Sequence, residues 1–330
     1  MKDFYIVFAV ATVAVFLLTV LAEHVMIPIL RSHKMGQRIL EIGPRWHKSK
    51  EGTPIMGGIG FILAAMIVMA IFFVVQGIRG SAAAFVPLAM TLAFAVGNGA
   101  VGFADDYCKL IKKQNEGLTR LQKLVLQSVL AVAYVAVMAH MGYLTTVVYL
   151  PFTDVAWDMG WVFYPVAVVA LLGVVNGANF TDGIDGLAST VSLVIGVFFA
   201  VLAFTLANES LGMSAAILIG ATLGFLIYNF HPARVFMGDT GSLFLGALII
   251  GAAFSCGIGV SGLIVCILFI LELLSSGLQI LYYKLTHGKR LFKMAPIHHH
   301  FEKCGWGEIK IVIIFSLFEA ALCLLAYFAL

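Results

Sequence analysis

Five aspartates stand in three short motifs, each of which lies between long apolar runs of this 330-residue chain. Asp105 and Asp106 occur in GFADDYCK, Asp182 and Asp185 in NFTDGIDGLA, and Asp239 in VFMGDTGS. Carboxylate oxygens gathered beside apolar sequence suit a hard cation, and Mg²⁺ commonly takes one or two of them together with phosphate oxygens and water. The motifs therefore predict a Mg²⁺ site, in which we expect Mn²⁺ to substitute.

Lys and His residues near the same motifs indicate the chemical class of the substrate, because both side chains can bind phosphate groups. The three consecutive histidines at 298–300 could instead form a zinc site. Neighbouring residues, however, seldom direct three imidazoles at one tetrahedral metal, and no Cys or His stands at zinc-finger spacing from these histidines. We therefore expect a phosphate-containing substrate. The candidate phosphate-binding residues are Lys50, Lys109, Lys123, His298, His299 and His300.

Helix capping is the structural alternative for the aspartates, since Asp is favoured at helix starts, where it accepts hydrogen bonds from backbone N–H groups. Capping accounts equally well for Asp182, Asp185 and Asp239 taken one at a time. It does not explain Asp105 and Asp106, whose adjacent like charges repel unless a cation compensates them. DGIDG also lacks the ligand spacing and the terminal glutamate of a calcium loop.

The composition indicates which elements position these residues. Hydrophobic residues make up 62% of the chain and charged residues 11%, against roughly 45–50% and about 25% in soluble domains. We therefore expect an all-α, polytopic integral membrane protein with about ten runs long enough to cross the hydrocarbon core. A helix over 242–283 would be about 60 Å long, twice the thickness of that core, so Gly257, Gly259 and Gly262 are expected to form a turn. The expected spans are 4–30, 54–77, 82–104, 121–141, 161–178, 184–207, 212–229, 242–256, 261–284 and 310–330.

The distribution of Lys and Arg predicts the orientation of the spans, because short loops rich in these residues stay in the cytoplasm. All of the 20 Lys and Arg residues except Lys2 and Arg79 fall in alternate loops. Both termini are therefore expected outside, with one transmembrane catalytic domain over 1–330. The net charge of +3 is then a topology signal, and no nucleic-acid partner is expected. The cytoplasmic loops expected to form the site are 31–53, 105–120, 179–183, 230–241 and 285–309.

The chain carries the motifs GTPIMGG (52–58), DDYCK (105–109), NFTDGIDGLA (179–188), FMGDTGSLFLG (236–246) and APIHHHFEKCGW (295–306). In order and spacing, these five motifs resemble those of the polyprenyl-phosphate N-acetylhexosamine-1-phosphate transferases. The last motif is similar to that of the bacterial branch whose donor carries a muramoyl pentapeptide. The resemblance extends over essentially the whole chain and departs at Ile55, where the family usually has Thr, and at Phe244, where it usually has a small residue.

The resemblance implies an Mg²⁺-dependent enzyme of the bacterial cytoplasmic membrane, with its active site on the cytoplasmic face. Such an enzyme transfers phospho-MurNAc-pentapeptide from UDP-MurNAc-pentapeptide to undecaprenyl phosphate, giving lipid I and UMP for peptidoglycan synthesis. A homodimer in the lipid bilayer is expected from the family alone. The nearest alternative in the family uses UDP-GlcNAc as the donor.

The resemblance also implies roles for the catalytic residues. Asp239 is expected to bind Mg²⁺ directly, with Asp105 or Asp106 nearby. Asp105 is the candidate base that keeps the lipid phosphate dianionic, and in a two-step scheme it would be the nucleophile instead. The expected catalytic set is Asp105, Asp106, Asp239 and His298.

For the donor substrate, the resemblance implies that the Phe236 ring stacks on uridine. Asp185 would contact the uracil base, and Lys109 would hold Asp185 in place. Lys50, Lys123 and the three histidines would hold phosphates. The residues expected to line the donor groove are Asn176, Asn179, Asp182 and Asn229.

Glu23, Glu272 and Glu319 lie inside expected spans and are the basis of a rival hypothesis, a transporter of protons or cations. An acidic side chain at the bilayer centre costs about 2.5 to 3.5 kcal/mol on insertion scales, so it usually faces protein or water. Transporters place their essential charges near the midplane at broken helices. The motif aspartates lie at span ends instead, which favours the enzyme over a transporter or a structural scaffold.

Overall fold

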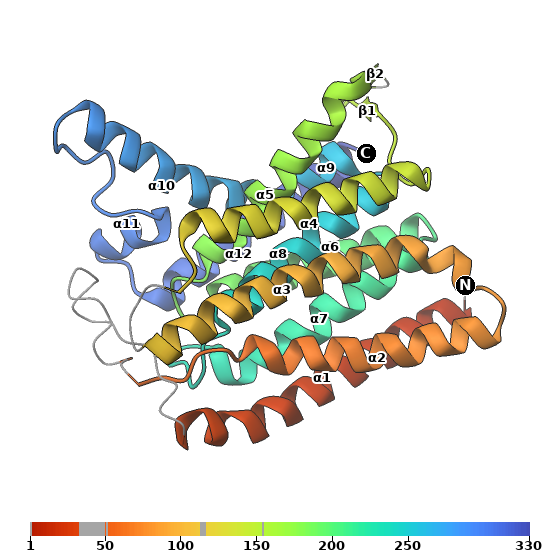
Figure 1. Ribbon diagram of the computed structural model, residues 1–330, viewed down its shortest axis with the longest axis horizontal. Helices are drawn as coiled ribbons and strands as arrows, with labels where there is room; N and C mark the ends of the chain where they lie inside the picture. The colour runs from red at the N-terminus through yellow and green to blue at the C-terminus, as the bar shows by residue number, and fades with distance from the viewer. Residues whose placement is uncertain (1, 33–49, 51, 113–116, 154) are drawn as a thin grey trace.

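The structure, a computed structural model, describes residues 2–32, 50, 52–112, 117–153 and 155–330. Within this part of the chain, ten helices are long and apolar enough to cross a membrane. The expected number of spans is confirmed, and the helices form one elongated bundle (Figure 1). They are α1 (Lys2–Ser32), α2 (Gly58–Ile78), α3 (Val86–Lys112), α4 (Arg120–His140), α5 (Phe163–Thr181), α6 (Leu187–Thr205), α7 (Glu209–Asn229), α8 (Gly238–Ser255), α10 (Ile267–Leu285) and α12 (Glu308–Phe328).

Short elements fill some of the connections between these helices. Two strands form an antiparallel hairpin in which Val148 lies opposite Trp157, so the all-α prediction misses a small piece of β structure. Most of the expected loop 31–53 lies outside the described residues. The short elements are η2 (Ala82–Phe85), β1 (Val147–Tyr149), β2 (Ala156–Asp158), η3 (Gly160–Val162), α9 (Gly259–Ile264) and α11 (Ile297–Lys303).

The connection between the eighth and ninth spans is a short helix rather than the simple turn predicted. Gly257 forms the turn, with φ of 74°, but Gly259 begins α9 and Gly262 lies inside it. A Cβ on Gly262 would lie 2.5 Å from the Cβ of Ala253. Gly262 therefore allows α9 to fold back against α8, and the ninth span begins at Ile267 instead of near 261.

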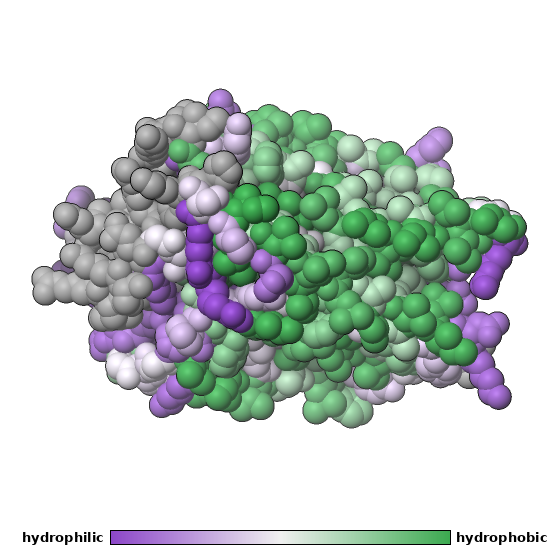
Figure 2. Space-filling model, turned by 90° about the horizontal axis from the view of Figure 1, so that it is seen from below, coloured by the Kyte–Doolittle hydropathy of each residue, from purple (hydrophilic) through white to green (hydrophobic). Residues whose placement is uncertain are grey.

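The surface of the bundle is divided into a broad apolar belt and two hydrophilic ends, as Figure 2 shows for one face. Large side chains such as Leu21 and Ile71 are 59% and 61% exposed in the described part of the chain. Apolar surface on this scale marks contact with lipid. Both chain termini lie away from the end that carries α11 (Figure 1).

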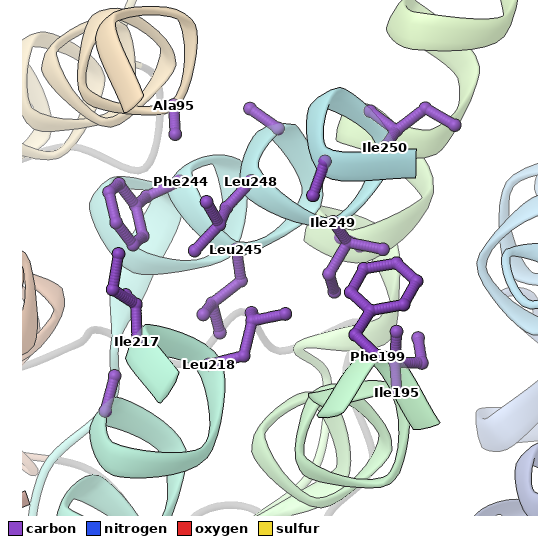
Figure 3. Close-up of a cluster of buried hydrophobic side chains, with 14 of the residues drawn as sticks. Ala95, Ile195, Phe199, Ile217, Leu218, Phe244, Leu245, Leu248, Ile249 and Ile250 are labelled. Atoms are coloured by element: carbon purple, nitrogen blue, oxygen red, sulfur yellow. The ribbon is translucent and has the colours of Figure 1, made fainter. Parts of the chain in front are cut away.

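Helix α8 forms the centre of the bundle. Its residues 240–254 are all buried, and it packs against α3, α5 and α2. A helix that is apolar on every side belongs in such a core. Figure 3 shows its side chains meeting those of α6 and α7. The labelled residues of this core are Ala95, Ile195, Phe199, Ile217, Leu218, Phe244, Leu245, Leu248, Ile249 and Ile250.

Glycines let neighbouring backbones approach α8 closely. A Cβ on Gly102 of α3 would overlap the carbonyl oxygen of Asp239, and one on Gly58 of α2 would overlap the backbone of Gly241. Small residues are the usual means by which membrane helices approach each other. These contacts bring the end of α3 against the start of α8.

We predict that Gly102→Ala destabilises the protein by about 1–3 kcal/mol, because overpacking against backbone atoms cannot be relieved by a side-chain rotation. Gly173→Ala is the matched control, since a Cβ there meets no atom within 4 Å. The measurement is the thermal unfolding midpoint in detergent. Equal midpoints for the two variants would contradict the packing argument.

Candidate active site

Asp105, Asp106 and Asp239 meet where α3 ends and α8 begins. One carboxylate oxygen from each belongs to a group whose members all lie within 4.8 Å of one another. The sequence predicts a loop over 105–120, but α3 continues to Lys112, so Asp105 and Asp106 are helical. We call these three residues the acidic cluster. All of its ligand atoms are oxygens, which suits a hard divalent cation.

Two lysines offset the charge of the acidic cluster. The Nζ of Lys109 lies 2.7 Å from Asp105 Oδ2, 3.7 Å from Asp106 Oδ1 and 3.0 Å from Asp239 Oδ2. Lys123 reaches the same oxygen of Asp239 from α4, at 2.8 Å. Lys109 follows Asp105 by one helical turn, which puts both on one face of α3. Of the three lysines predicted for the site, Lys109 and Lys123 therefore lie at the acidic cluster.

The three carboxylates differ in what they already bind. Asp106 accepts hydrogen bonds from the N–H groups of Asp239 at 3.3 Å and Thr240 at 3.0 Å, and from the Thr240 hydroxyl at 2.8 Å. Asp106 thus caps α8 from another helix, the role that the sequence allowed for Asp239. Asp105 accepts the N–H of Leu118 at 2.7 Å. The Asp239 side chain is 18% exposed, against 5% for Asp105 and 2% for Asp106, so it is the carboxylate most open to a ligand.

Asn179 connects α5 to the acidic cluster. Its Nδ2 donates to Asp239 Oδ1 at 2.8 Å, and its Oδ1 accepts from Lys123 at 3.4 Å. Asn176, one turn earlier, donates instead to Oε1 of Gln127 on α4 at 3.0 Å. Of the two predicted asparagines on α5, Asn179 therefore binds the cluster, whereas Asn176 joins α5 to α4.

The capping interpretation is wrong for both aspartates of the 179–188 motif. Helix α5 ends at Thr181, so Asp182 follows a helix C-terminus. Helix α6 begins at Leu187, and its N-cap residue is Gly186, with φ of 77°. Neither Asp182 nor Asp185 occupies the position at which a carboxylate caps a helix start.

Asp185 belongs to a second charged group. Its Oδ1 lies 2.7 Å from Lys50 Nζ, and its Oδ2 lies 3.0 Å from His231 Nδ1. Glu308 binds Lys50 at 2.6 Å and accepts the N–H of Asp185 at 3.1 Å. The predicted pairing of Asp185 with Lys109 is therefore wrong, because Lys109 is engaged in the acidic cluster and Lys50 takes its place.

His231 and Glu308 were not predicted as site residues. The available signals were a histidine inside the expected loop 230–241 and a glutamate at the end of the expected loop 285–309. Oxygens of Asp185 and Glu308 lie close enough to His231 to hold a cation, but the ammonium of Lys50 already bridges the two carboxylates. This group is an ion-pair network.

Asp182 keeps some exposure to solvent, yet its carboxyl is surrounded by protein. Burial raises the pKa of Asp182 well above its usual range, and the negative charges of Asp239, Asp106 and Asp185 raise it further. These surroundings therefore favour the neutral carboxyl more than water does for a free aspartate. A bound cation would oppose this shift by favouring the carboxylate.

The three histidines on α11 bind different neighbours, so the structure does not direct them at a single metal. His298 is fully buried, and its Nδ1 lies 3.0 Å from Glu272. His299 contacts Glu302, on the same helix. His300 accepts the N–H of Lys293 at 3.1 Å, which places it against the α10–α11 connection.

Asn229 and Phe236 have different relations to the site. Asn229 is buried and holds the chain that follows it, because its Nδ2 donates to the Val235 carbonyl at 3.0 Å while its Oδ1 accepts from Ser189 at 3.1 Å. The backbone of Phe236 donates to the Pro54 carbonyl at 2.9 Å. Its ring is half-buried, three residues before Asp239, and keeps surface on which an aromatic ligand could stack.

The fold and the site together define a polytopic membrane protein whose carboxylate–lysine centre suits a divalent cation and phosphate groups. The pattern of the family described as glycosyl transferase family 4 matches residues 88–257. A Caldicellulosiruptor bescii phospho-N-acetylmuramoyl-pentapeptide-transferase is 40% identical over 96% of this chain and 95% of its own length. Proteins of the same name from Clostridium kluyveri and Bacillus subtilis are each 41% identical, over 96% and 91% of this chain and 96% and 90% of their own lengths. The chain belongs to this family of membrane phospho-sugar transferases, which confirms the resemblance drawn from the motifs.

We predict a pH-dependent effect of Asp182→Asn on stability. Because the pKa of Asp182 is raised on folding, the folded protein holds this proton from about pH 4 up to the raised pKa, and stability falls as pH rises through that window. Asn has no proton to lose. The unfolding midpoint of the variant minus that of the wild type, measured with EDTA, should therefore grow between about pH 5 and about pH 8. A difference that is the same at both pH values would contradict the assigned shift.

Proposed function

We propose that this protein transfers phospho-MurNAc-pentapeptide from UDP-MurNAc-pentapeptide to undecaprenyl phosphate and releases UMP. The product, lipid I, enters peptidoglycan synthesis. The observation that carries the proposal is the 40% identity, over 96% of this chain, to a relative named for this transfer. The position of the charged site at one end of an apolar bundle supports it, because a soluble anionic donor and a lipid acceptor can both reach that end.

Mg²⁺, or Mn²⁺ in its place, is the cofactor that the acidic cluster suits best. Asp239 would be the principal ligand because it is the most exposed of the three carboxylates, and Asp105 would be the second. When bound, the cation reduces the repulsion between donor and acceptor phosphates and stabilises charge that passes to the leaving UMP. Asp106 would hold the start of α8 in place through its hydrogen bonds from the N–H groups of Asp239 and Thr240.

The lysines of the site bring the two phosphate-bearing substrates together. Transfer forms a bond between an oxygen of the lipid phosphate and the sugar-bearing phosphorus of the donor, and it breaks the bond from that phosphorus to UMP. Lys109 and Lys123 share Asp239 Oδ2, so either ammonium can turn to a phosphate oxygen while the other keeps the aspartate paired. Lys50 can do the same beside Asp185 and Glu308.

Direct transfer in one step is the mechanism that these contacts support. Both oxygens of Asp105 are engaged, one by Leu118 N–H and the other by Lys109, which leaves this carboxylate poorly presented as a nucleophile. The second pKa of a phosphate lies near about 6, so the acceptor is mostly dianionic at neutral pH and needs little help from a base. Asp105 would mainly orient Lys109.

Phe236 and the second charged group are proposed to hold the donor. The half-buried ring of Phe236 lies three residues before Asp239, which would put a stacked uridine within reach of the metal and its phosphates. Asp185 is buried and both of its oxygens are engaged, by Lys50 and by His231, so it would serve the base by holding these two side chains in position. Asp182, on the same loop, would complete the donor groove.

The proposed location is the bacterial cytoplasmic membrane, with the site facing the cytoplasm and both termini outside. The distribution of Lys and Arg supports this orientation. A homodimer is proposed on the family resemblance. Within the family, a UDP-GlcNAc donor is the alternative that the next experiment separates.

We predict that the purified protein with Mg²⁺ releases UMP from UDP-MurNAc-pentapeptide and undecaprenyl phosphate, and that EDTA abolishes the release. Asp239→Asn should lower turnover about 100- to 1000-fold while the protein still folds, because compensation of charge at a transferring phosphate acts in the transition state. Asp158→Asn, in the exposed strand β2, is the control and should retain activity. Release from UDP-GlcNAc alone would assign the other donor, and normal turnover of Asp239→Asn would remove that residue from the site.

We predict the orientation from accessibility to a membrane-impermeant thiol reagent. In a variant without the five native cysteines, Arg79→Cys should be labelled in intact cells and Lys293→Cys only after the membrane is opened. Both residues are exposed, so burial does not bias the comparison. Labelling of Lys293→Cys in intact cells would reverse the proposed orientation.

A further inference from the structure

Glu272 is a carboxylate inside the membrane-spanning helix α10 that faces a base. Its side chain and that of His298 are both fully buried, and Glu272 Oε2 lies 3.0 Å from His298 Nδ1. The two residues are 26 positions apart and belong to α10 and α11, which pack together (Figure 1). An ionisable side chain kept within a membrane span, with a partner, marks a functional element.

The other two glutamates inside spans lack such a partner. Among the described residues, neither carboxylate oxygen of Glu23 makes a hydrogen bond. In the described part of the chain, Glu319 accepts a hydrogen bond only from the weak thiol donor of Cys323 in the same helix, α12, at 3.7 Å. Glu272 is thus distinguished from them by its imidazole neighbour.

The opposite side of the His298 ring faces the loop between α5 and α6. A Cβ on Gly183 would overlap Nε2 of His298, so the ring lies directly against this loop, between Asp182 and Asp185. Among the described residues, Nε2 is buried and makes no hydrogen bond. A polar atom in this state is costly unless a ligand or water completes it.

We propose that Glu272 is a positioning residue for the transfer reaction: it keeps the proton of His298 on Nδ1 and the Nε2 atom turned toward the 182–185 loop. The inference rests on the proposed function, because the donor groove is assigned to that loop.

The carboxylate of Glu272 can only accept a hydrogen bond when ionised, so Nδ1 must carry a proton in both the neutral and the charged imidazole. Nε2 then has a lone pair in the neutral ring and a proton in the charged ring. Histidine is used in this way wherever one ring nitrogen is fixed by a partner and the other meets the substrate. His298 could therefore accept a proton from a donor group or give one to a phosphate oxygen at a fixed position.

Glu272→Gln tests the proposal, because the amide has the same shape but can offer either an oxygen or an N–H group to Nδ1. Turnover for UMP release should fall about 100-fold or more, with little change in the KM for the donor and in the unfolding midpoint. The same substitution in a His298→Asn background should cause no further loss, since residues that act as a unit are not additive. Glu319→Gln is the matched control, an equally buried glutamate without an imidazole, and should keep wild-type turnover.

Turnover of Glu272→Gln close to that of the wild type, or a loss that is equally large in the His298→Asn background, would overturn the proposal. Should Glu272→Gln not fold, Glu272→Asp decides, because it keeps the charge and withdraws it from Nδ1 by one methylene. Its loss must likewise disappear in the His298→Asn background. Absence of UMP release from the wild-type protein would instead reject the proposed function.

Discussion

The contact between the end of α3 and the start of α8 is the constraint on which the site depends. Gly102 removes the side chain that would hold the two backbones apart. Asp106 then binds the first free N–H groups of α8, where a negative charge is also favoured by the helix dipole. The position of Asp239 and of the lysines that reach it follows from this junction, because Asp239 is in the first turn of α8.

Both charged groups use one arrangement, in which an ammonium lies between carboxylates. Lys109 joins the members of the acidic cluster, and Lys50 joins Asp185 to Glu308. Removing charge from water at the edge of a membrane is expensive unless each charge has a partner. Under the proposed function, a phosphate and a cation that arrived together would exchange these partners without leaving a charge unpaired. The resting ion pairs thus keep the site stable and ready for an anionic substrate.

The sequence predicts the spans well, because a run of apolar residues of the right length has few alternatives in a bilayer. Lys109 lies one helical turn after Asp105, but the prediction placed 105–120 in a loop and paired Lys109 with Asp185 instead. The partner of Asp185 could not be predicted from sequence spacing. Lys50 is 135 residues distant, and such a pair depends on how the helices are rotated and stacked. The direction of each histidine on α11 depends on the same packing.

At two smaller features the local sequence pattern was present but was not used correctly in the prediction. The β-branched and aromatic residues of TTVVY, at 145–149, are typical of a strand, and the prediction of an all-helical chain passed over them. Gly262 signals a turn by residue type, yet its role is to let α9 lie against α8. At 145–149 the local pattern predicts the strand that forms, and at 262 the packing of α9 against α8 accounts for the glycine.

The enclosure of α8 has a consequence for the biogenesis of the protein. This helix is rich in glycine and is covered on all sides by other helices, so lipid is a poor environment for it. Three helices that cover it, α3, α5 and α7, precede it in the chain and are synthesised earlier. Helix α8 can therefore leave the insertion machinery into a groove of protein that already exists. The order of the helices along the chain is thus also an order of assembly, in which α8 is inserted after several of the helices that surround it.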